Sequence, residues 1–502
     1  MDRVYKMRRG DFSCLSCISM SIMPFRRCPI GIEYPEQIAA NFRYGASALQ
    51  RRMPRRIHTF DAFLNPNYRL LWVSNFFAYI SRWMQMTMLG WFVFEETGSA
   101  FLVTLVGFSG MGPLVALGVF GGVLAERLDK RKLLLGTLFA NLLAAVGMAA
   151  LIFSDLIFST SNVQYWHAYL VMLVGGIGWG LDMPSRRTIV LDVLGRARVN
   201  NAIALDSVGM HSSRMLGPLI GGGLITISQL LFSEGYGLEA GYAMTLIFFI
   251  ASAIMMLNVK TPTHEGTTAL QTVKDIFSNT VVFKELVEGV RYVCSEATLL
   301  AVVLITVFMN LLLFPYQQLI PVMASEVLHV GPTLMGLLLA FEGLGALTGS
   351  IAIASASNLT HHGRVYLFGS MAGLTMLLAF SFSQWYGVSL ALMLMLGLGT
   401  AGFGAMQATI ILLVARDDMR GRGLGVITLA IGAGPIGGLI LGRMADAIGA
   451  PMAMTINAVL GLITVGLVGL MVPSLRGRMT SDSEAESAEA SGAQPATAGG
   501  GN

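Results

Sequence analysis

The chain has 502 residues, of which 54% are hydrophobic and only 12% are charged, and its net charge is +4. Its mean hydropathy of +0.66 lies well above that of soluble globular proteins. These values exclude a soluble globular protein and indicate a membrane protein that crosses the bilayer several times.

The first sixty residues differ from the rest of the chain in being polar and rich in arginine. Their one mixed apolar run, residues 13–25, is too short and too polar to cross a bilayer. We predict that residues 1–60 form a disordered cytoplasmic extension, unless translation starts at Met53. Three cysteines in this extension lack a fourth metal ligand nearby, so we expect no metal site there.

A helix that crosses a bilayer needs about 20 mostly apolar residues. Twelve such runs follow, near residues 70–93, 101–125, 133–153, 166–185, 203–231, 241–259, 297–323, 333–356, 365–384, 386–413, 421–441 and 449–472. Lys and Arg gather in the loops at one end of these runs, and positively charged loops stay in the cytoplasm. We therefore predict an all-α integral membrane protein with twelve transmembrane helices and both termini in the cytoplasm. The positive charge reflects this topology, so we expect no nucleic-acid partner.

An internal repeat divides these runs into two sets of six. Gly-Trp-Gly at 178–180 in the fourth run is matched by Gly-Phe-Gly at 402–404 in the tenth, and GPLIGG at 217–222 in the fifth by GPIGG at 434–438 in the eleventh. Such repeats predict two pseudo-symmetric bundles of six helices, with a substrate site near the bilayer midplane between them.

The predicted domains follow from this repeat. Residues 61–259 form an N-terminal six-helix bundle and residues 297–472 a C-terminal one. Residues 260–296 form a central cytoplasmic linker, in which residues 273–292 read as an amphipathic helix on the inner membrane surface. Residues 473–502 are rich in Ser, Glu, Ala and Gly, and we expect this tail to be disordered.

The segment GGVLAERLDKRK at 121–132 resembles the loop signature between the second and third membrane helices of the major facilitator superfamily. Residues 63–85, 182–207, 283–300, 319–349 and 417–450 are similar to the enterobactin-exporter-like branch of that superfamily, the transmembrane secretion effectors. The resemblance implies the major facilitator fold. It also implies a secondary active transporter in a bacterial inner membrane that exports a small molecule, siderophore-like or hydrophobic, by alternating access with proton antiport.

The expected partners are therefore a small-molecule substrate, protons and membrane lipid, and we expect a monomer without cofactors. The chain has neither a P-loop nor a G-x-S-x-G elbow, which argues against ATP-driven transport and against an enzyme. An importer on the same fold, or a transporter-like sensor or assembly partner without transport, remains as an alternative.

Charged residues around the second loop are candidates for a conformational latch, since such contacts can hold one state of a rocking transporter. Asp206 and Arg214, eight residues apart in the fifth run, are candidates for a gating or folding ion pair. The alternative is that the loop charges only set the topology. The predicted latch and gating residues are Gly122, Glu126, Arg127, Asp129, Arg131, Asp206, Arg214, Asp417, Asp418 and Arg420.

The paired Gly-Pro motifs predict helix kinks and close helix packing, because proline removes a helix hydrogen bond and glycine lets backbones approach. In the fifth run the motif also resembles the antiporter signature, although generic packing explains the same residues. The predicted kink and packing residues are Gly217, Pro218, Gly221, Gly222, Gly434, Pro435 and Gly438.

Polar groups within membrane helices are costly, so each is a candidate functional residue. The first, fourth, seventh and tenth helices line the cavity in this superfamily, and this analogy selects Arg82, Gln85, Trp179, Asn310, Tyr316, Gln317 and Gln407 for substrate contact. Arg82 could bind an anionic cargo, or it could neutralise Glu342 as a structural pair.

Glu342 in the eighth run is the best candidate for proton coupling, because a buried carboxyl group can exchange a proton as its surroundings change. A buried ion pair is the competing interpretation. His211 is a candidate proton relay, although a single histidine is more often structural.

Overall fold

The structure is a computed structural model, and it describes residues 58–127, 129–158, 162–194, 199–232, 237–260, 280–355, 361–416 and 418–477. The compact unit described below lies within Thr59–Asn502. Most of the predicted N-terminal extension, the predicted C-terminal tail from residue 478 and residues 261–279 of the predicted linker lie outside the described residues.

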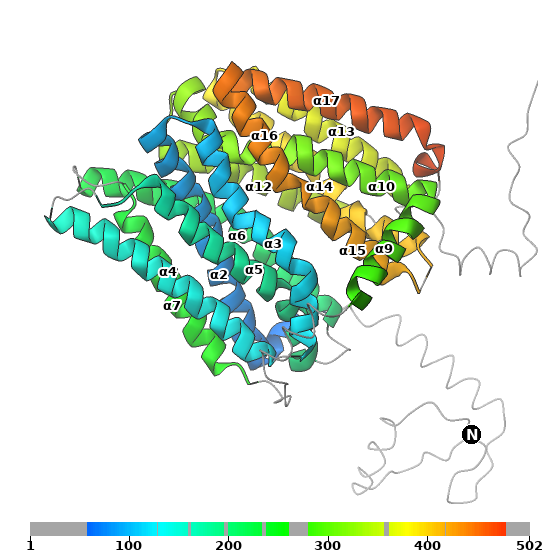
Figure 1. Ribbon diagram of the computed structural model, residues 1–502, viewed down its shortest axis with the longest axis horizontal. Helices are drawn as coiled ribbons and strands as arrows, with labels where there is room; N and C mark the ends of the chain where they lie inside the picture. The colour runs from blue at the N-terminus through cyan, green and yellow to red at the C-terminus, as the bar shows by residue number, and fades with distance from the viewer. Residues whose placement is uncertain are drawn as a thin grey trace, which may run out of the picture. The chain divides into compact units, whose positions relative to one another are not determined.

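The first part of the described chain is helical throughout (Figure 1). Its elements are η2 His58–Leu64, α2 Pro66–Thr97, α3 Ala100–Arg127, α4 Lys130–Phe158, α5 Tyr165–Leu194, α6 Val199–Leu231 and α7 Glu239–Asn258. Local signals set the limits of α2. The Asn65 side chain accepts hydrogen bonds from the first turn, and Gly98 ends the helix at φ 62° in the left-handed region, where glycine is favoured.

The second part is also helical in its described residues. Its elements are α9 Thr280–Ser295, α10 Ala297–Phe308, η3 Met309–Leu313, η4 Phe314–Leu319, α11 Ile320–Val322, η5 Met323–Val327, α12 Pro332–Ser355, α13 His362–Ser381, α14 Tyr386–Val414, α15 Arg420–Ile431, α16 Ala433–Ile448, α17 Ala450–Met471 and η6 Pro473–Arg476. Each of the predicted apolar runs overlaps one of the helical segments of the two parts.

Two of these segments are interrupted. The seventh apolar run changes from α-helix to a π turn at Met309 and then to a 3₁₀ turn that contains Pro315. The eleventh is interrupted at Gly432, between α15 and α16. The two interruptions pack together, because a β-carbon added at Gly437 would overlap the carbonyl oxygen of Leu311. Irregular helix in a membrane is tolerated where neighbouring parts of the protein satisfy the hydrogen bonds of its backbone. Such irregular turns are often found at functional sites.

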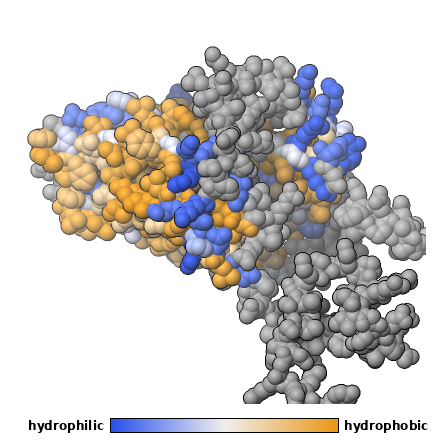
Figure 2. Space-filling view, turned by 90° about the horizontal axis from the view of Figure 1, so that it is seen from below, coloured by the Kyte–Doolittle hydropathy of each residue, from blue (hydrophilic) through white to orange (hydrophobic). Residues whose placement is uncertain are grey.

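Ten of the described segments are long and apolar enough to cross a membrane. Figure 2 shows a broad apolar surface on the described residues. Large apolar side chains on α4, α6, α13 and α17 are more than half exposed, among them Phe139, Leu230, Phe368 and Met471. A soluble protein rarely exposes so much apolar surface. The chain is therefore a multi-pass membrane protein.

The two largest contacts between helices of the two parts are those of α3 with α16 and of α6 with α12. Glycines allow the close approach of α6 and α12. A β-carbon at Gly222 would overlap the Pro332 carbonyl oxygen, and one at Gly336 would overlap that of Pro218. Nearby, the Thr333 hydroxyl donates to the Thr226 hydroxyl at 2.8 Å.

The remaining predicted packing residues lie at two other contacts. A β-carbon at Gly217 would lie 2.6 Å from the side chain of Trp83, and one at Gly221 would lie 3.1 Å from that of Met84, so both serve the contact of α6 with α2. Pro218 and Pro435 lie inside α6 and α16. Gly434 faces Asn310 and Gly438 faces Gln318, at the interrupted seventh segment.

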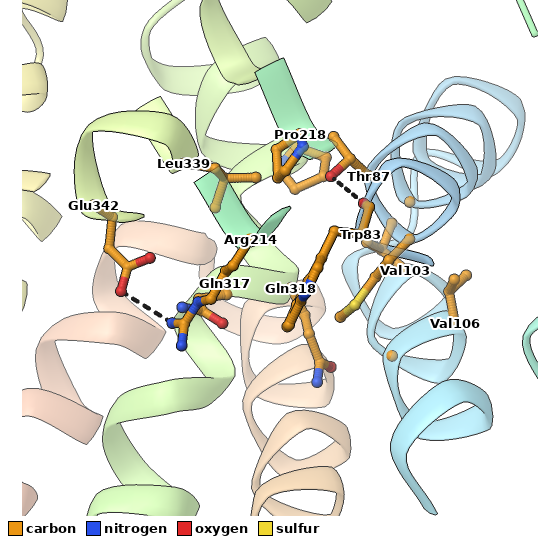
Figure 3. Close-up of a pocket in the computed structure, with 14 residues that line it drawn as sticks. Trp83, Thr87, Val103, Val106, Arg214, Pro218, Gln317, Gln318, Leu339 and Glu342 are labelled. Atoms are coloured by element: carbon orange, nitrogen blue, oxygen red, sulfur yellow. Dashed lines mark hydrogen bonds and ion pairs between the residues drawn. The ribbon is translucent and has the colours of Figure 1, made fainter. Parts of the chain in front are cut away.

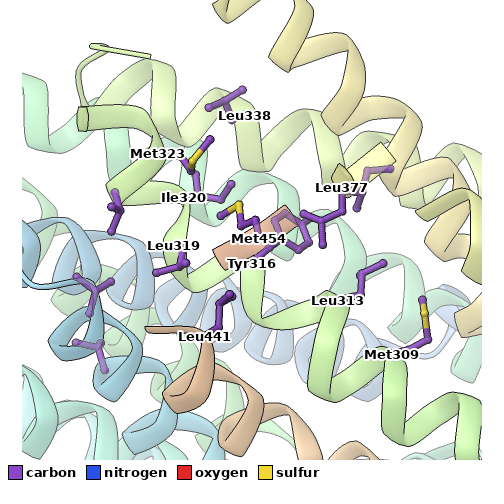
Figure 4. Close-up of a cluster of buried hydrophobic side chains, with 14 of the residues drawn as sticks. Met309, Leu313, Tyr316, Leu319, Ile320, Met323, Leu338, Leu377, Leu441 and Met454 are labelled. Carbon is purple, nitrogen blue, oxygen red and sulfur yellow. The ribbon is translucent and has the colours of Figure 1, made fainter. Parts of the chain in front are cut away.

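The interrupted segment carries a large apolar cluster (Figure 4). Met309, Leu313, Leu319, Ile320 and Met323 from this segment meet side chains of α12, α13, α16 and α17, and all five are fully buried. The side chains around this segment are therefore held firmly, which fixes the position of the glutamines that follow Tyr316.

Candidate functional site

A small cavity lies where α2, α3 and α6 meet the η4–α11 segment and α12 (Figure 3). It encloses about 40 Å³, which is room for about three water molecules. A transported molecule of ordinary size therefore needs a wider cavity than this one. The lining residues are Trp83, Met86, Thr87, Gly90, Val103, Val106, Gly107, Arg214, Pro218, Gln317, Gln318, Pro321, Leu339 and Glu342.

An ion pair crosses this cavity from α6 to α12. Nη2 of Arg214 lies 3.0 Å from Oε1 of Glu342, and the Glu342 carboxylate is almost fully buried, whereas the Arg214 side chain is 24% exposed. Removing one partner of a buried ion pair costs several kcal/mol, because the other charge is left uncompensated. The pair therefore ties the first part of the chain to the second at the centre of the protein.

Arg214 is also the first member of a row of two arginines and two tryptophans. The Arg214 guanidinium lies 5.7 Å from the ring centre of Trp83, and that ring meets Trp179 edge to face at 6.0 Å. Arg82 lies over the other indole, 4.7 Å from the Trp179 ring centre. We call Arg82, Trp179, Trp83 and Arg214 the cation–π row. Arg214 rather than Arg82 is thus the partner of Glu342.

The other predicted cavity residues are spread over different surroundings. Gln317 lines the cavity, whereas Tyr316 is fully buried in the apolar cluster beside it. Gln85 does not line the cavity, because it lies on the face of α2 opposite Trp83. Asn310 donates to the Thr306 carbonyl oxygen at 2.9 Å.

Gln407 lies among the second-part helices, where it donates to the Thr306 hydroxyl at 3.3 Å. His211 lies on α6, three residues before Arg214, and is partly buried. Neither residue is among those that line the cavity. The relay role of His211 stays a prediction.

A buried polar cluster in the first part was missed in the sequence analysis. Arg186 and Asp182 of α5 form an ion pair of 3.1 Å, and both side chains are almost fully buried. Thr137 donates to Asp182, Arg186 donates to the side-chain oxygen of Asn75, and Asn75 donates to Asp206 at 3.2 Å. The sequence did contain a pattern that indicates this pair, because an acid and a base four residues apart lie on one helix face. The predicted fourth run ended at residue 185, so it included Asp182 but not Arg186.

Asp129, Arg131 and Asp418 of the predicted latch contact residues of their own part of the chain. Asp129 caps α4 by accepting from the backbone N–H of Arg131 at 3.0 Å, and Nη2 of Arg131 donates to the Leu257 carbonyl oxygen at 2.5 Å. Asp418 pairs with Arg416 at 3.4 Å, and both are exposed. Arg420 is the first residue of α15. Gly122, Glu126 and Arg127 lie in α3, but their side-chain contacts and Asp417 lie outside the described residues.

At the opposite end of α3, an acid from α16 holds the two parts of the chain together. Asp446 accepts hydrogen bonds from the backbone N–H groups of Ala100 at 2.6 Å and Phe101 at 3.3 Å, and from the Ser99 hydroxyl at 2.8 Å. The N–H groups at the start of a helix have no acceptor within the helix itself, and a negative charge is favourable there. No sequence pattern indicated this contact, because its partners are some 350 residues apart.

We expect Asp446→Ala to loosen this contact by about 1 kcal/mol, which is a factor of about five in the opening equilibrium. Thr104 is fully buried beside Gly442 at the same interface. A cysteine at position 104, in a background without the native cysteines, should therefore be alkylated about five times faster in the Asp446→Ala variant. Glu96→Ala, which removes an exposed acid, is the matched control. Equal alkylation rates in the Asp446→Ala and Glu96→Ala variants would contradict the role of Asp446.

Comparison with known proteins identifies the family. Residues 57–494 match the family model described as transmembrane secretion effector. The chain belongs to this family. Two relatives are the staphyloferrin A transporter of Staphylococcus aureus, 21% identical over 75% of this chain and 89% of that protein, and the multidrug efflux pump Tap of Mycolicibacterium fortuitum, 24% identical over 72% and 84%.

The fold agrees with this family. A crystal structure of a D-xylose–proton symporter superimposes with a TM-score of 0.62 at 14% identity, over 83% of this chain and all of that one. The chain is thus a major facilitator transporter of the transmembrane secretion effector family. Proteins of this kind move solutes and are not enzymes.

Proposed function

We propose that this protein exports a small molecule, siderophore-like or hydrophobic, from the cytoplasm by alternating access coupled to proton entry. The observation that carries this proposal is the Arg214–Glu342 ion pair, which joins α6 to α12 inside the central cavity. A staphyloferrin A transporter and a multidrug efflux pump among the relatives support this range of cargo.

The proposal includes twelve membrane spans in two six-helix bundles. Besides the ten apolar segments, α2 with 32 residues and α5 with 30 residues are long enough to cross. In α5, Asp182 and Arg186 are accommodated inside the first part by their ion pair. Six spans then precede α9 and six follow it. The positive loops support an inner-membrane protein with both termini in the cytoplasm.

In this topology the contacts of Asp446, and of Gly222 with Pro332, lie toward the outer side of the membrane. The conformation is then closed to the outside, and export requires these contacts to separate. Glu342 is bonded to Arg214 and interacts electrostatically with Tyr316. Protonation of Glu342 removes its charge and weakens the pair with Arg214, so proton binding can bias the contact between α6 and α12.

The test is accumulation of labelled siderophores and lipophilic drugs in efflux-deficient bacteria that express the protein. We expect accumulation of at least one compound to fall, and a protonophore to restore it. Cells with the empty vector are the control. Increased accumulation would indicate an importer, and unchanged accumulation across the panel would favour a sensor or assembly partner.

A further inference from the structure

Among the arginines near the cavity, Arg82 has no acid bonded to it. Arg214 is paired with Glu342, and Arg186 is paired with Asp182. Within the described part of the chain, Arg82 makes a ring contact with Trp179 but no ion pair or hydrogen bond. Asp182 attracts the Arg82 guanidinium electrostatically, yet one of its oxygens accepts from Thr137 and the other from Arg186.

The surroundings of Arg82 offer hydrogen-bond donors. The indole N–H of Trp179 is buried and has no partner among the described residues, and the whole side chain is only 8% exposed. A guanidinium has five N–H donors and no acceptor. Arg82 itself is partly exposed and lies one helical turn before Met86, which lines the cavity. A positive charge with unpaired donors beside a cavity matches an anion.

Arg82 and Trp179 lie beside the cavity, and part of the cavity lining matches an apolar body. Met86, Val103 and Leu339 are apolar, and Trp83 of the cation–π row presents an aromatic surface. Glu342 is the only acid among the described lining residues, and Arg214 already neutralises it. A lipophilic cation therefore finds no free counter-charge in this lining.

We propose that the exported molecule carries an anionic group, a carboxylate or a similar oxyanion, which binds the Arg82 guanidinium and the Trp179 indole N–H. In a conformation with a wider cavity, its apolar or aromatic body lies against Trp83 and Met86. This inference rests on the proposed export function and narrows its cargo to amphipathic anions in preference to cations.

The test compares 2-naphthoate with 2-naphthamide, which have the same shape and differ in charge. Binding to the purified full-length protein is followed by tryptophan fluorescence, since Trp83 and Trp179 adjoin the site. We expect the naphthoate to bind about ten times more tightly, as one charged hydrogen-bonded contact provides. Arg82→Gln should remove this preference, so that the two compounds bind equally. Arg82→Lys should keep most of the preference, and Trp179→Phe should lose part of it.

Equal binding of the two compounds to the unmodified protein would overturn the inference. No binding of naphthoate at concentrations up to about 1 mM would also overturn it, because even a weakly bound fragment of this size is detected at that concentration. The midpoint of thermal unfolding in detergent, measured without ligand, shows whether the Arg82 variants are folded. The outcomes also separate the two proposals. Gradient-dependent export of cations without a preference for anions would contradict the anionic cargo alone. A clear preference for naphthoate, with no compound exported from cells, would contradict the export function alone.

Discussion

Glu342→Gln is expected to abolish proton-driven export while retaining exchange of substrate across the membrane. Glutamine keeps the shape of the side chain but can neither carry a charge nor exchange a proton. The variant also leaves Arg214 without its partner 3.0 Å away, which costs up to about 3–5 kcal/mol where both groups are buried. In proteoliposomes with an imposed proton gradient, we expect uphill transport to fall to the level of protein-free liposomes, because the variant has no carboxyl group that can bind and release the coupled proton.

A double-mutant cycle separates coupling from stability. Arg214→Gln together with Glu342→Gln removes both charges, so the double variant should be more stable than either single variant. It should still lack proton-driven transport, because no titratable carboxyl group remains at this place. Glu326→Gln, in the η5 turn outside the cavity, is the matched control. Full gradient-driven export by Glu342→Gln would exclude Glu342 as the coupling site.

Substitutions at the neighbouring positions Gly222 and Gly223 are expected to have opposite effects. A β-carbon at Gly222 would overlap the Pro332 carbonyl oxygen of α12, whereas one at Gly223 would meet nothing within 4 Å. Gly222→Ala should therefore destabilise the protein by about 1–3 kcal/mol, as overpacking does. Gly223→Ala should stabilise it by up to about 1 kcal/mol, since alanine favours helix.

The midpoint of thermal unfolding in detergent measures both changes, and each variant is the control for the other. Gly222→Ala should also weaken the closed contact of α6 with α12 and increase alkylation of a cysteine at Thr226. Equal stability of the two variants would show that α6 and α12 do not approach as closely as described.

The sequence by itself determined the class of protein and the position of its helices. A bilayer-spanning helix satisfies its own backbone hydrogen bonds and needs only a long apolar run, so local composition was enough to place most helix ends within a few residues. The predicted ends at residues 185 and 441 were too early, because α5 continues to Leu194 and α16 to Ile448. Hydropathy falls at Asp182 and Arg186, which the helix tolerates because each is bonded inside the protein.

Only the tertiary structure decided which polar residues meet. Glu342 was recognised as a buried acid, but its partner is Arg214, 128 residues away. Gln85 and Trp83 lie on the same helix, and only the packing of α2 shows that Trp83 faces the cavity. Asp446 carried no signal, because its partners are backbone groups at the start of α3. Such contacts depend on how helices far apart in the chain pack, and neither hydropathy nor spacing within a segment contains that information.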